Sequence, residues 1–226
     1  MNKISYNKRN SEKHHRRSIR LREYDYSQAG GYFVTICTRN SEYIFGKVVN
    51  GVMKLNKYGH VVEEEWRKTA RLRKDVKIDV FMVMPNHFHG IVMINEDCRG
   101  TARRAPIVEL FGKPVIGSLP TIIRSFKSAV AKQINIIHNS PGISVWQRNY
   151  YEHVIRNENE LNLIRQYILY NPLQWQYDRE NPEHIPNKNY ENQWGDFEEI
   201  IYSKTITEQT GCLFHRQKTG KSNIPV

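Results

Sequence analysis

The order of its strand and helix patterns constrains the fold of this chain more than any other feature. Four segments have the β-branched and aromatic content of strands: 32–38, 76–84, 87–95 and 143–151. Three segments have the spacing or capping signals of helices: 58–72, the stretch that begins at Ser118, and the stretch from Asn157 or Asn159 to Tyr170. A small hairpin is predicted separately, because Asn50-Gly51 joins two further apolar runs.

This order predicts an α+β fold. Strand, helix, strand, strand, helix and strand form the split βαβ, or ferredoxin-like, arrangement: an antiparallel sheet with helices packed on one face. The last predicted helix is an addition at the C-terminal end of that unit. The open face of such a sheet often binds single-stranded nucleic acid.

Composition excludes several classes of protein. With 226 residues, 39% hydrophobic and 25% charged, the chain is typical of soluble globular proteins. It has neither the ~18-residue apolar run of a transmembrane helix nor the apolar stretch of a secretory signal. Its three cysteines are far apart, which argues against a disulfide framework or a thiolate zinc site. We expect no membrane partner and a cytoplasmic, nucleoid-associated location.

Net charge divides the chain into three parts. Of the total of +11, residues 1–22 contribute eight Lys or Arg against one Glu. We therefore expect a basic N-terminal arm over 1–22, a folded domain over 23–178, and a peripheral or partly disordered tail over 179–226. The arm fits two interpretations, an extension that binds a polyanion or a solvated disordered tail.

The residues with the clearest chemical potential are His87 and His89. Motifs of phosphate-binding loops, α/β-hydrolases and zinc proteases are absent. Since alternate residues of a strand share a face, His87 and His89 point the same way while Phe88 enters the opposite layer. This geometry suits two neighbouring ligands of a metal ion. Two histidines hydrogen-bonded at the end of a strand would give the same pattern.

The last predicted helix provides a second element. Its core stripe consists of Leu161, Ile164 and Ile168. Tyr167 lies at the border of that stripe, Tyr170 points away, and Asn171 projects near Tyr167 if the helix continues that far. The position of Tyr167 also fits ordinary packing, with the ring inside and the hydroxyl outside.

Four blocks within residues 19–178 resemble the single-tyrosine HUH transposases of small insertion sequences, in particular their REP-associated branch. The blocks are Arg20-Leu-Arg-Glu-Tyr-Asp-Tyr-Ser-Gln-Ala-Gly-Gly-Tyr-Phe-Val-Thr-Ile-Cys-Thr38, Met84-Pro-Asn-His-Phe-His-Gly90, Trp146-Gln-Arg-Asn-Tyr-Tyr-Glu-His-Val-Ile-Arg156 and Tyr167-Ile-Leu-Tyr-Asn-Pro172. The resemblance implies that His87 and His89 bind a divalent cation, that Tyr167 is the nucleophile, and that Asn171 completes the metal site.

The resemblance further implies a metal-dependent transposase that cleaves and rejoins single-stranded DNA near hairpins, as a monomer or a homodimer. Tyrosine can form a covalent phosphoester, which gives a 5′-phosphotyrosine and a free 3′-OH and makes the step reversible. A site of imidazole and oxygen ligands suits Mg²⁺ or Mn²⁺.

Basic and aromatic residues supply candidate DNA contacts. The candidates are Arg16, Arg17, Arg20, Arg22, Arg124, Lys127, Arg148, Tyr150, Tyr151 and Arg156. Two other functions remain open: a non-catalytic nucleic-acid-binding module of the same fold, and a metallonuclease that hydrolyses DNA with an activated water.

Overall fold

A four-stranded antiparallel sheet is the centre of the structure. The computed structural model describes residues 24–95, 115–195 and 197–198, and all of these belong to one unit, Glu23–Lys204. The second unit, Met1–Arg22 with Thr205–Val226, lies outside the described residues, and so do the four arginines of the predicted arm.

The sheet has the strand order β4-β5-β1-β6, and every neighbouring pair is antiparallel. Its strands are β1 (Gly30–Cys37), β4 (Val76–Val83), β5 (His87–Ile94) and β6 (Tyr151–Ile155). This is the order expected for a split βαβ unit, because β5 lies between the two strands that α1 connects. The predicted α+β, ferredoxin-like fold is confirmed.

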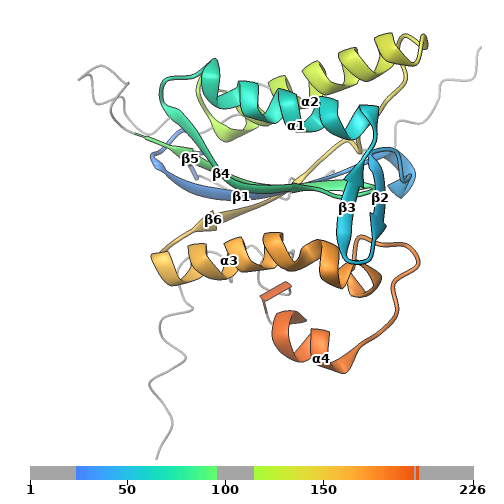
Figure 1. Cartoon of the computed structure of the whole chain (residues 1–226). Coiled ribbons are helices and arrows are strands. Elements are labelled where there is room, and N and C mark those ends of the chain that lie inside the picture. Colours follow the sequence, from blue (N-terminus) through green and yellow to red (C-terminus); the bar gives the residue numbers. More distant parts are fainter. Residues whose placement is uncertain (1–23, 96–114, 196, 199–226) are drawn as a thin grey trace, which may run out of the picture. The chain divides into compact units, whose positions relative to one another are not determined.

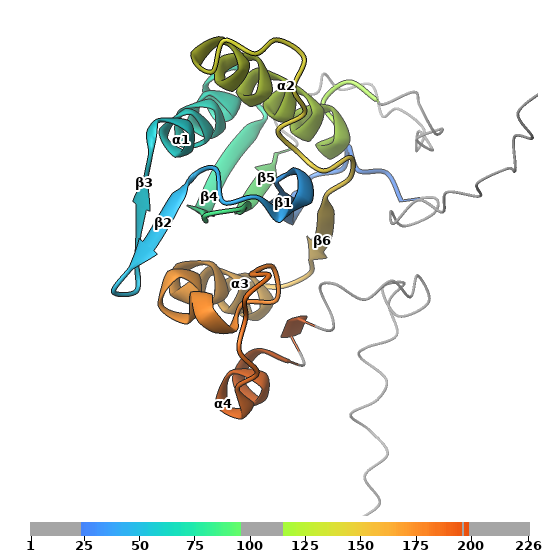
Figure 2. The same ribbon diagram turned by 90° about the vertical axis from the view of Figure 1, so that its right-hand side faces the viewer.

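Helices cover both faces of the sheet (Figures 1 and 2). They are α1 (Lys57–Arg71), α2 (Leu119–Ile137) and α3 (Glu158–Tyr170). On one face, Trp66 of α1 and Phe126 of α2 pack on Phe88 of β5, with ring centroids 4.6 and 5.4 Å away. On the other face, α3 buries Ile164 against Phe33 and neighbouring side chains. The two helices of the βαβ unit therefore share one face, as predicted, and α3 covers the other.

The predicted hairpin is formed by β2 (Gly46–Val49) and β3 (Val52–Leu55). Asn50 and Gly51 have φ angles of 52° and 72°, the left-handed conformation that a two-residue hairpin turn requires.

One predicted strand differs from the structure. The sequence predicted a strand over 143–151, whereas the regular strand begins at Tyr151, and Trp146 makes an isolated bridge with Thr38. The backbone of 145–147 bonds to the end of β1 and the residues after it, through Gln147 N–H to the Cys37 carbonyl and Arg39 N–H to the Val145 carbonyl, each at 2.9 Å. The carbonyl oxygens of residues 147, 148 and 149 accept from the Lys127 ammonium at 2.7 to 3.4 Å, so they do not extend a strand ladder.

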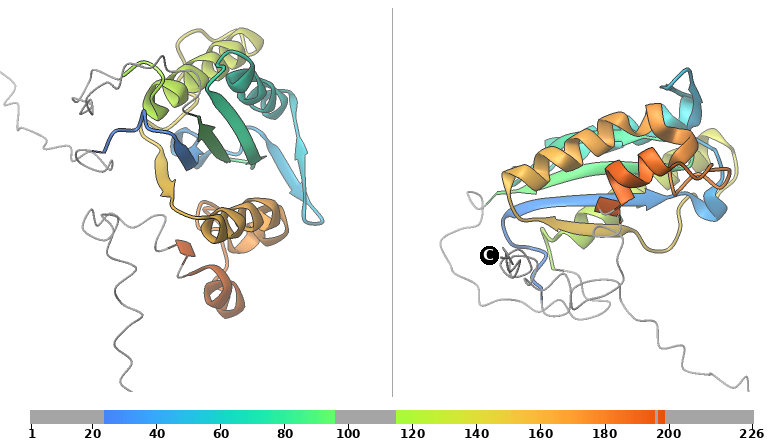
Figure 3. Two further views of the ribbon diagram at one scale, coloured as in Figure 1. Left: turned by 90° about the vertical axis from the view of Figure 1, so that its left-hand side faces the viewer. Right: turned by 90° about the horizontal axis from the view of Figure 1, so that it is seen from below.

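The packed region continues beyond residue 178, where the sequence predicted the end of the folded domain. A 3-10 helix over Asn171–Tyr177 follows α3, and the short helix α4 (Lys188–Tyr190) leads into a π-helical turn over Glu191–Gly195. Tyr190, Trp194 and Phe197 are buried in the same hydrophobic cluster as Tyr167. Figure 3 shows α4 beside α3, on the side of α3 away from the sheet. No helix in the part of the chain that the structure describes is long and apolar enough to cross a membrane.

Candidate active site

The two histidines lie on β5, an interior strand of the sheet. His87 pairs with Cys37 and His89 with Thr35, both on β1, and both histidines are fully buried. Their ring centroids are 4.4 Å apart, while Phe88 between them enters the layer of α1 and α2. The alternation expected from the sequence is therefore present.

Gly90 follows His89 on β5 and lies on the sheet face that α1 and α2 cover, where the close packing of aromatic rings requires a glycine. A Cβ atom at Gly90 would lie 2.8 Å from ring atoms of Phe88 and of Trp66. No side chain fits there unless the aromatic core moves.

Hydrogen bonds at the Nδ1 atoms hold both imidazoles. The Thr35 hydroxyl lies 2.8 Å from Nδ1 of His89, and Oδ1 of Asn86 lies 2.9 Å from Nδ1 of His87. Because the Asn86 amide nitrogen donates to the carbonyl of Glu180 at 2.7 Å, its oxygen accepts from His87. This fixes the hydrogen of His87 on Nδ1 and leaves a lone pair on Nε2.

Burial keeps both imidazoles neutral. It lowers the pKa of His87 to about 3, and it also lowers the pKa of His89, with a smaller effect of the neighbouring His87. A neutral imidazole is the form that binds metal ions.

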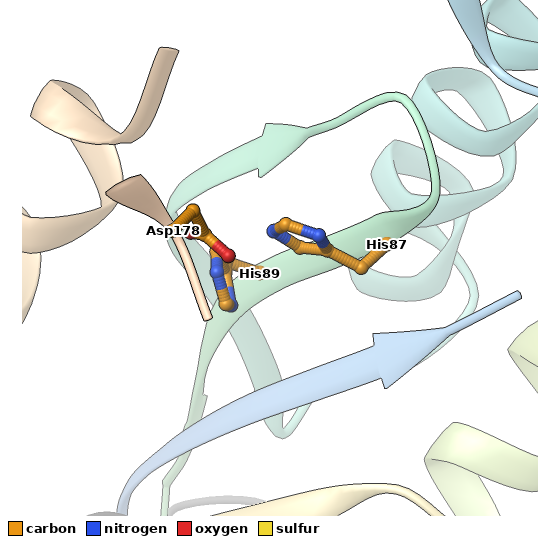
Figure 4. Close-up of side chains that lie close together, drawn as sticks. All are labelled: His87, His89 and Asp178. Atoms are coloured by element: carbon orange, nitrogen blue, oxygen red, sulfur yellow. The ribbon is translucent and has the colours of Figure 1, made fainter. Parts of the chain in front are cut away.

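A buried carboxylate completes the cluster. Ligand atoms of His87, His89 and Asp178 all lie within 4.8 Å of one another. Figure 4 shows the Asp178 carboxylate facing the two rings. Asp178 accepts hydrogen bonds from the Asn171 amide and, at 2.7 Å, from the backbone amide of Glu180. Burial raises the pKa of Asp178, while the nearby His89 and the Asn171 amide act in the opposite direction.

The donor set fits a divalent cation. Nε2 of His87, Nε2 of His89 and Oδ1 of Asn171 are buried without a hydrogen-bond partner. Buried polar atoms normally find partners, so three such atoms around one carboxylate indicate a place for a ligand. Imidazole nitrogens with carboxylate and amide oxygens suit Mn²⁺ or Mg²⁺.

The predicted third ligand, Asn171, therefore lies next to a carboxylate that no sequence pattern indicated. Asn171 is 2% exposed and is joined to the cluster by its hydrogen bond to Asp178. Asp178 follows the 3-10 helix, and no spacing rule predicted that this turn returns the chain to β5.

Tyr167 lies beside the histidines. Its ring centroid is 5.4 Å from that of His89. The ring also contacts Trp194 and Phe197 at 5.5 and 5.2 Å, and Tyr167 as a whole is 2% exposed. Its hydroxyl donates to Glu198 at 3.0 Å. Tyr170, by contrast, is 48% exposed.

The predicted DNA contacts are not all brought together. Thr35 of β1 pairs with His89 on one side and with Tyr151 on the other, so Tyr151 lies on the same sheet face as His89. Tyr151 also packs against the hydrophobic cluster that contains Tyr167. Arg124 and Lys127 lie on α2, which covers the opposite face. Arg148 and Arg156 are exposed, and Tyr150 is half-buried.

Comparisons with known proteins found a curated relative and several solved structures that resemble this chain, two of which are described below. No family model matches the chain. An uncharacterized protein of Haemophilus influenzae is 41% identical over 175 residues, which are 76% of this chain and 96% of that protein.

The first solved structure is a REP-associated tyrosine transposase bound to a REP hairpin: 19% identity, TM-score 0.43, covering 66% of this chain and 69% of that chain. The second is a candidate transposase from Deinococcus radiodurans: 15% identity, TM-score 0.38, covering 63% and 90%.

Proposed function

The chain belongs to the same family as the Haemophilus influenzae protein, and we propose that it is a metal-dependent enzyme that cleaves and rejoins single-stranded DNA through Tyr167. One observation carries the proposal: the Tyr167 ring packs on His89, whose Nε2, like that of His87, is buried without a hydrogen-bond partner. The proposed nucleophile and a set of buried atoms able to bind a metal ion are thus neighbours. The four sequence blocks that resemble single-tyrosine transposases support the same assignment.

His87, His89 and Asp178 would hold the cation, with the Asn171 oxygen as a further donor. When bound, Mg²⁺ or Mn²⁺ would polarise the scissile phosphate and help to orient it. Thr35 and Asn86 act behind the histidines, because their hydrogen bonds set the ring orientations.

Tyr167 supplies the covalent chemistry. Its oxygen attacks the phosphorus, the bond between phosphorus and O3′ breaks, and the products are a 5′-phosphotyrosine and a free 3′-OH. Attack by a 3′-OH on the phosphotyrosine reverses the step, so strands are rejoined without a nucleotide cofactor. Fixing Tyr167 between β1 and the segment that contains Trp194 reduces the number of orientations it must search.

We infer a hairpin-forming single strand as the substrate from the resemblance of the sequence blocks. Tyr151 provides an aromatic ring on the site's face of the sheet, where an unpaired base could stack. The exposed Arg148 and Arg156 flank β6 and would contact phosphates.

The test is the formation of a protein–DNA adduct. Wild-type protein is incubated with labelled, hairpin-bearing single-stranded DNA and Mn²⁺, and the products are separated under denaturing conditions. We expect a labelled band that migrates with the protein, its complete loss in Tyr167→Phe, and its retention in Tyr170→Phe. Tyr170 is the matched control, since it lies on the same helix but is about half exposed.

The other outcomes separate the alternatives. An adduct that persists in Tyr167→Phe excludes Tyr167 as the nucleophile. Cleavage without an adduct indicates a hydrolytic metallonuclease, and DNA binding without cleavage indicates a non-catalytic module.

A further inference from the structure

The Tyr167 hydroxyl points to a carboxylate far along the chain. It donates to Oε1 of Glu198 at 3.0 Å, across 31 residues of sequence. We propose that Glu198 is the catalytic base that accepts the proton of Tyr167 when its oxygen attacks DNA, an inference that rests on the function proposed above.

A second phenol fixes the same carboxylate. The Tyr190 hydroxyl donates to Oε1 of Glu198 at 2.6 Å, so two phenols share one acceptor oxygen. An ionised carboxylate has only acceptor atoms and suits this arrangement. Tyr190 is 7% exposed, and its ring lies 6.0 Å from that of Tyr177, which restricts where it can hold Glu198.

The surroundings give the two phenols different roles. Burial raises the pKa of Tyr190, and the negative charges of Asp178 and Glu198 raise it further. Tyr190 therefore keeps its proton and acts as a fixed donor. Burial also raises the pKa of Glu198, with opposing hydrogen bonds from both tyrosines, a further rise from Asp178 and a lowering by Arg179. A carboxylate with a raised pKa is a stronger proton acceptor than an exposed one.

A cavity connects Glu198 with solvent. It has a volume of about 170 Å³, and its lining includes Arg179, His184, Tyr190 and Glu198. A base must release its proton between turnovers, and water in this cavity can accept it. Glu198 thus contacts the reacting oxygen on one side and a solvent-accessible space on the other.

The proton balance of the step is simple. As the bond between the tyrosine oxygen and phosphorus forms, the phenolic proton passes to Glu198. The electron pair of the breaking bond goes to O3′, which takes a proton from solvent, and Glu198 returns its proton to solvent through the cavity. In the rejoining step Glu198 first takes a proton from solvent through the cavity and then protonates the departing phenolate of Tyr167, while the attacking 3′-OH gives its proton to solvent.

The test compares Glu198→Gln with a matched control, Glu183→Gln. Both exchange a carboxylate for an amide in the segment that follows α3, but Glu183 is exposed and does not line the cavity. We expect Glu198→Gln to slow adduct formation by about 100- to 10,000-fold while hairpin affinity is retained, and Glu183→Gln to match wild type.

Replacing Tyr167 with 3-fluorotyrosine separates a base from a structural support. The fluorinated phenol is more acidic and needs less help to lose its proton. We expect fluorination to increase the rate of adduct formation by a larger factor in Glu198→Gln than in wild type. An equal effect in both backgrounds would mean that Glu198 only supports the fold, and a Glu198→Gln variant as fast as wild type, or faster, overturns the proposal outright.

Two readouts keep this inference distinct from the proposed function. If wild type forms an adduct that requires Tyr167 and Glu198→Gln leaves its rate unchanged, the function stands and the base is wrong. If wild type forms no adduct, the function itself fails, and the base with it. If Glu198→Gln strongly lowers the melting temperature, Glu198→Asp is measured as well. Because aspartate keeps a carboxylate, we expect its rate of adduct formation to lie between the rates of wild type and Glu198→Gln.

Discussion

At the scale of single residues, the orientation of the two imidazoles is decided by groups that are not themselves candidate metal ligands. Asn86 and Thr35 bind the Nδ1 atoms, and Phe88 fixes the strand between them by packing on Trp66. With both rings held in this way, the Nε2 atoms stay buried and make no hydrogen bond. The imidazole rings are therefore fixed in orientation before a ligand binds, and binding costs little further side-chain entropy.

The Thr35→Val variant tests this support. With Nε2 of His89 as a ligand, its Nδ1 carries the hydrogen and donates to the Thr35 hydroxyl, and valine removes that acceptor at nearly constant volume. We expect the affinity for Mn²⁺, measured by calorimetry, to fall about 10- to 100-fold. Thr38→Val is the matched control, since the Thr38 hydroxyl donates to the carbonyl of Glu42 instead. Equal affinities for wild type and Thr35→Val would contradict a supporting role.

The sequence predicts those site residues whose positions depend on a single strand or helix, and it misses those that tertiary packing brings to the site. His87 and His89 share a sheet face because side chains alternate along a strand. Tyr167 is placed beside the core stripe of α3 by the 3.6-residue period of a helix. Asp178 and Glu198 reach the site through a 3-10 helix and a π-helical turn, whose paths depend on tertiary packing. Sequence periodicity carries no information about such returns.

At the scale of elements, α3 is tied to the sheet by an ion pair. Arg165 of α3 donates to both carboxylate oxygens of Asp79 on β4, with Nε at 3.2 Å from each and the nearest guanidinium nitrogen at 2.6 Å. The pair joins the helix that carries Tyr167 to the strand beside β5. Bidentate geometry makes it stronger than an ordinary surface pair.

This pair predicts a pH-dependent contribution to stability. Burial raises the pKa of Asp79, but the hydrogen bonds from Arg165 and from the Val80 amide outweigh it, so the net pKa is below its ordinary value. The stabilisation is therefore present above about pH 4 and is lost as pH falls through the folded-state pKa. In urea titrations, Asp79→Asn should unfold more easily than wild type at pH 7, and the difference should shrink below about pH 4. A difference that is constant with pH would contradict this assignment.

Local signals predicted most elements, and the exception has a physical cause. The turn Asn50-Gly51 and the N-cap Asn157, which accepts from the backbone of Glu160 at 2.9 Å, act within a few residues. The segment 143–151 has strand-like composition, yet three of its carbonyls bind Lys127 of α2. That competitor is distant in sequence, so the pattern within the segment could not reveal it.

At the scale of the whole molecule, the charge is unevenly divided between the arm and the rest. Residues 1–22 hold eight of the 34 Lys and Arg residues, all outside the described part of the chain. Residues 178, 180 and 198, in contrast, place carboxylates close to the candidate metal cluster. DNA would thus be attracted by one part of the chain and processed at another that is locally acidic.

Deleting residues 1–18 tests the arm as a DNA contact. The deletion removes six Lys or Arg residues, and each one that neutralises a phosphate adds about 0.7 to the slope of log K against log[salt] on a single strand. We expect weaker hairpin binding, a slope reduced by up to about 4, and an unchanged melting temperature. A full-length variant with those six residues changed to Gln should behave in the same way. An identical slope before and after deletion would rule out an arm that contacts phosphates.

The packing of Phe88 between the two histidines has a consequence for how this protein can evolve. The two faces of β5 alternate along the chain: His87 and His89 lie on the face of the candidate metal cluster, and Phe88 lies on the face of the aromatic core of Trp66 and Phe126. Inserting or deleting one residue between His87 and His89 would exchange the two sets, sending an imidazole into the core and a core side chain into the site. Substitutions in β5 leave each residue on its face of the sheet, whereas an insertion or deletion of one residue reverses the face of every later residue in the strand. We therefore expect evolution to tolerate substitutions here far better than changes of length.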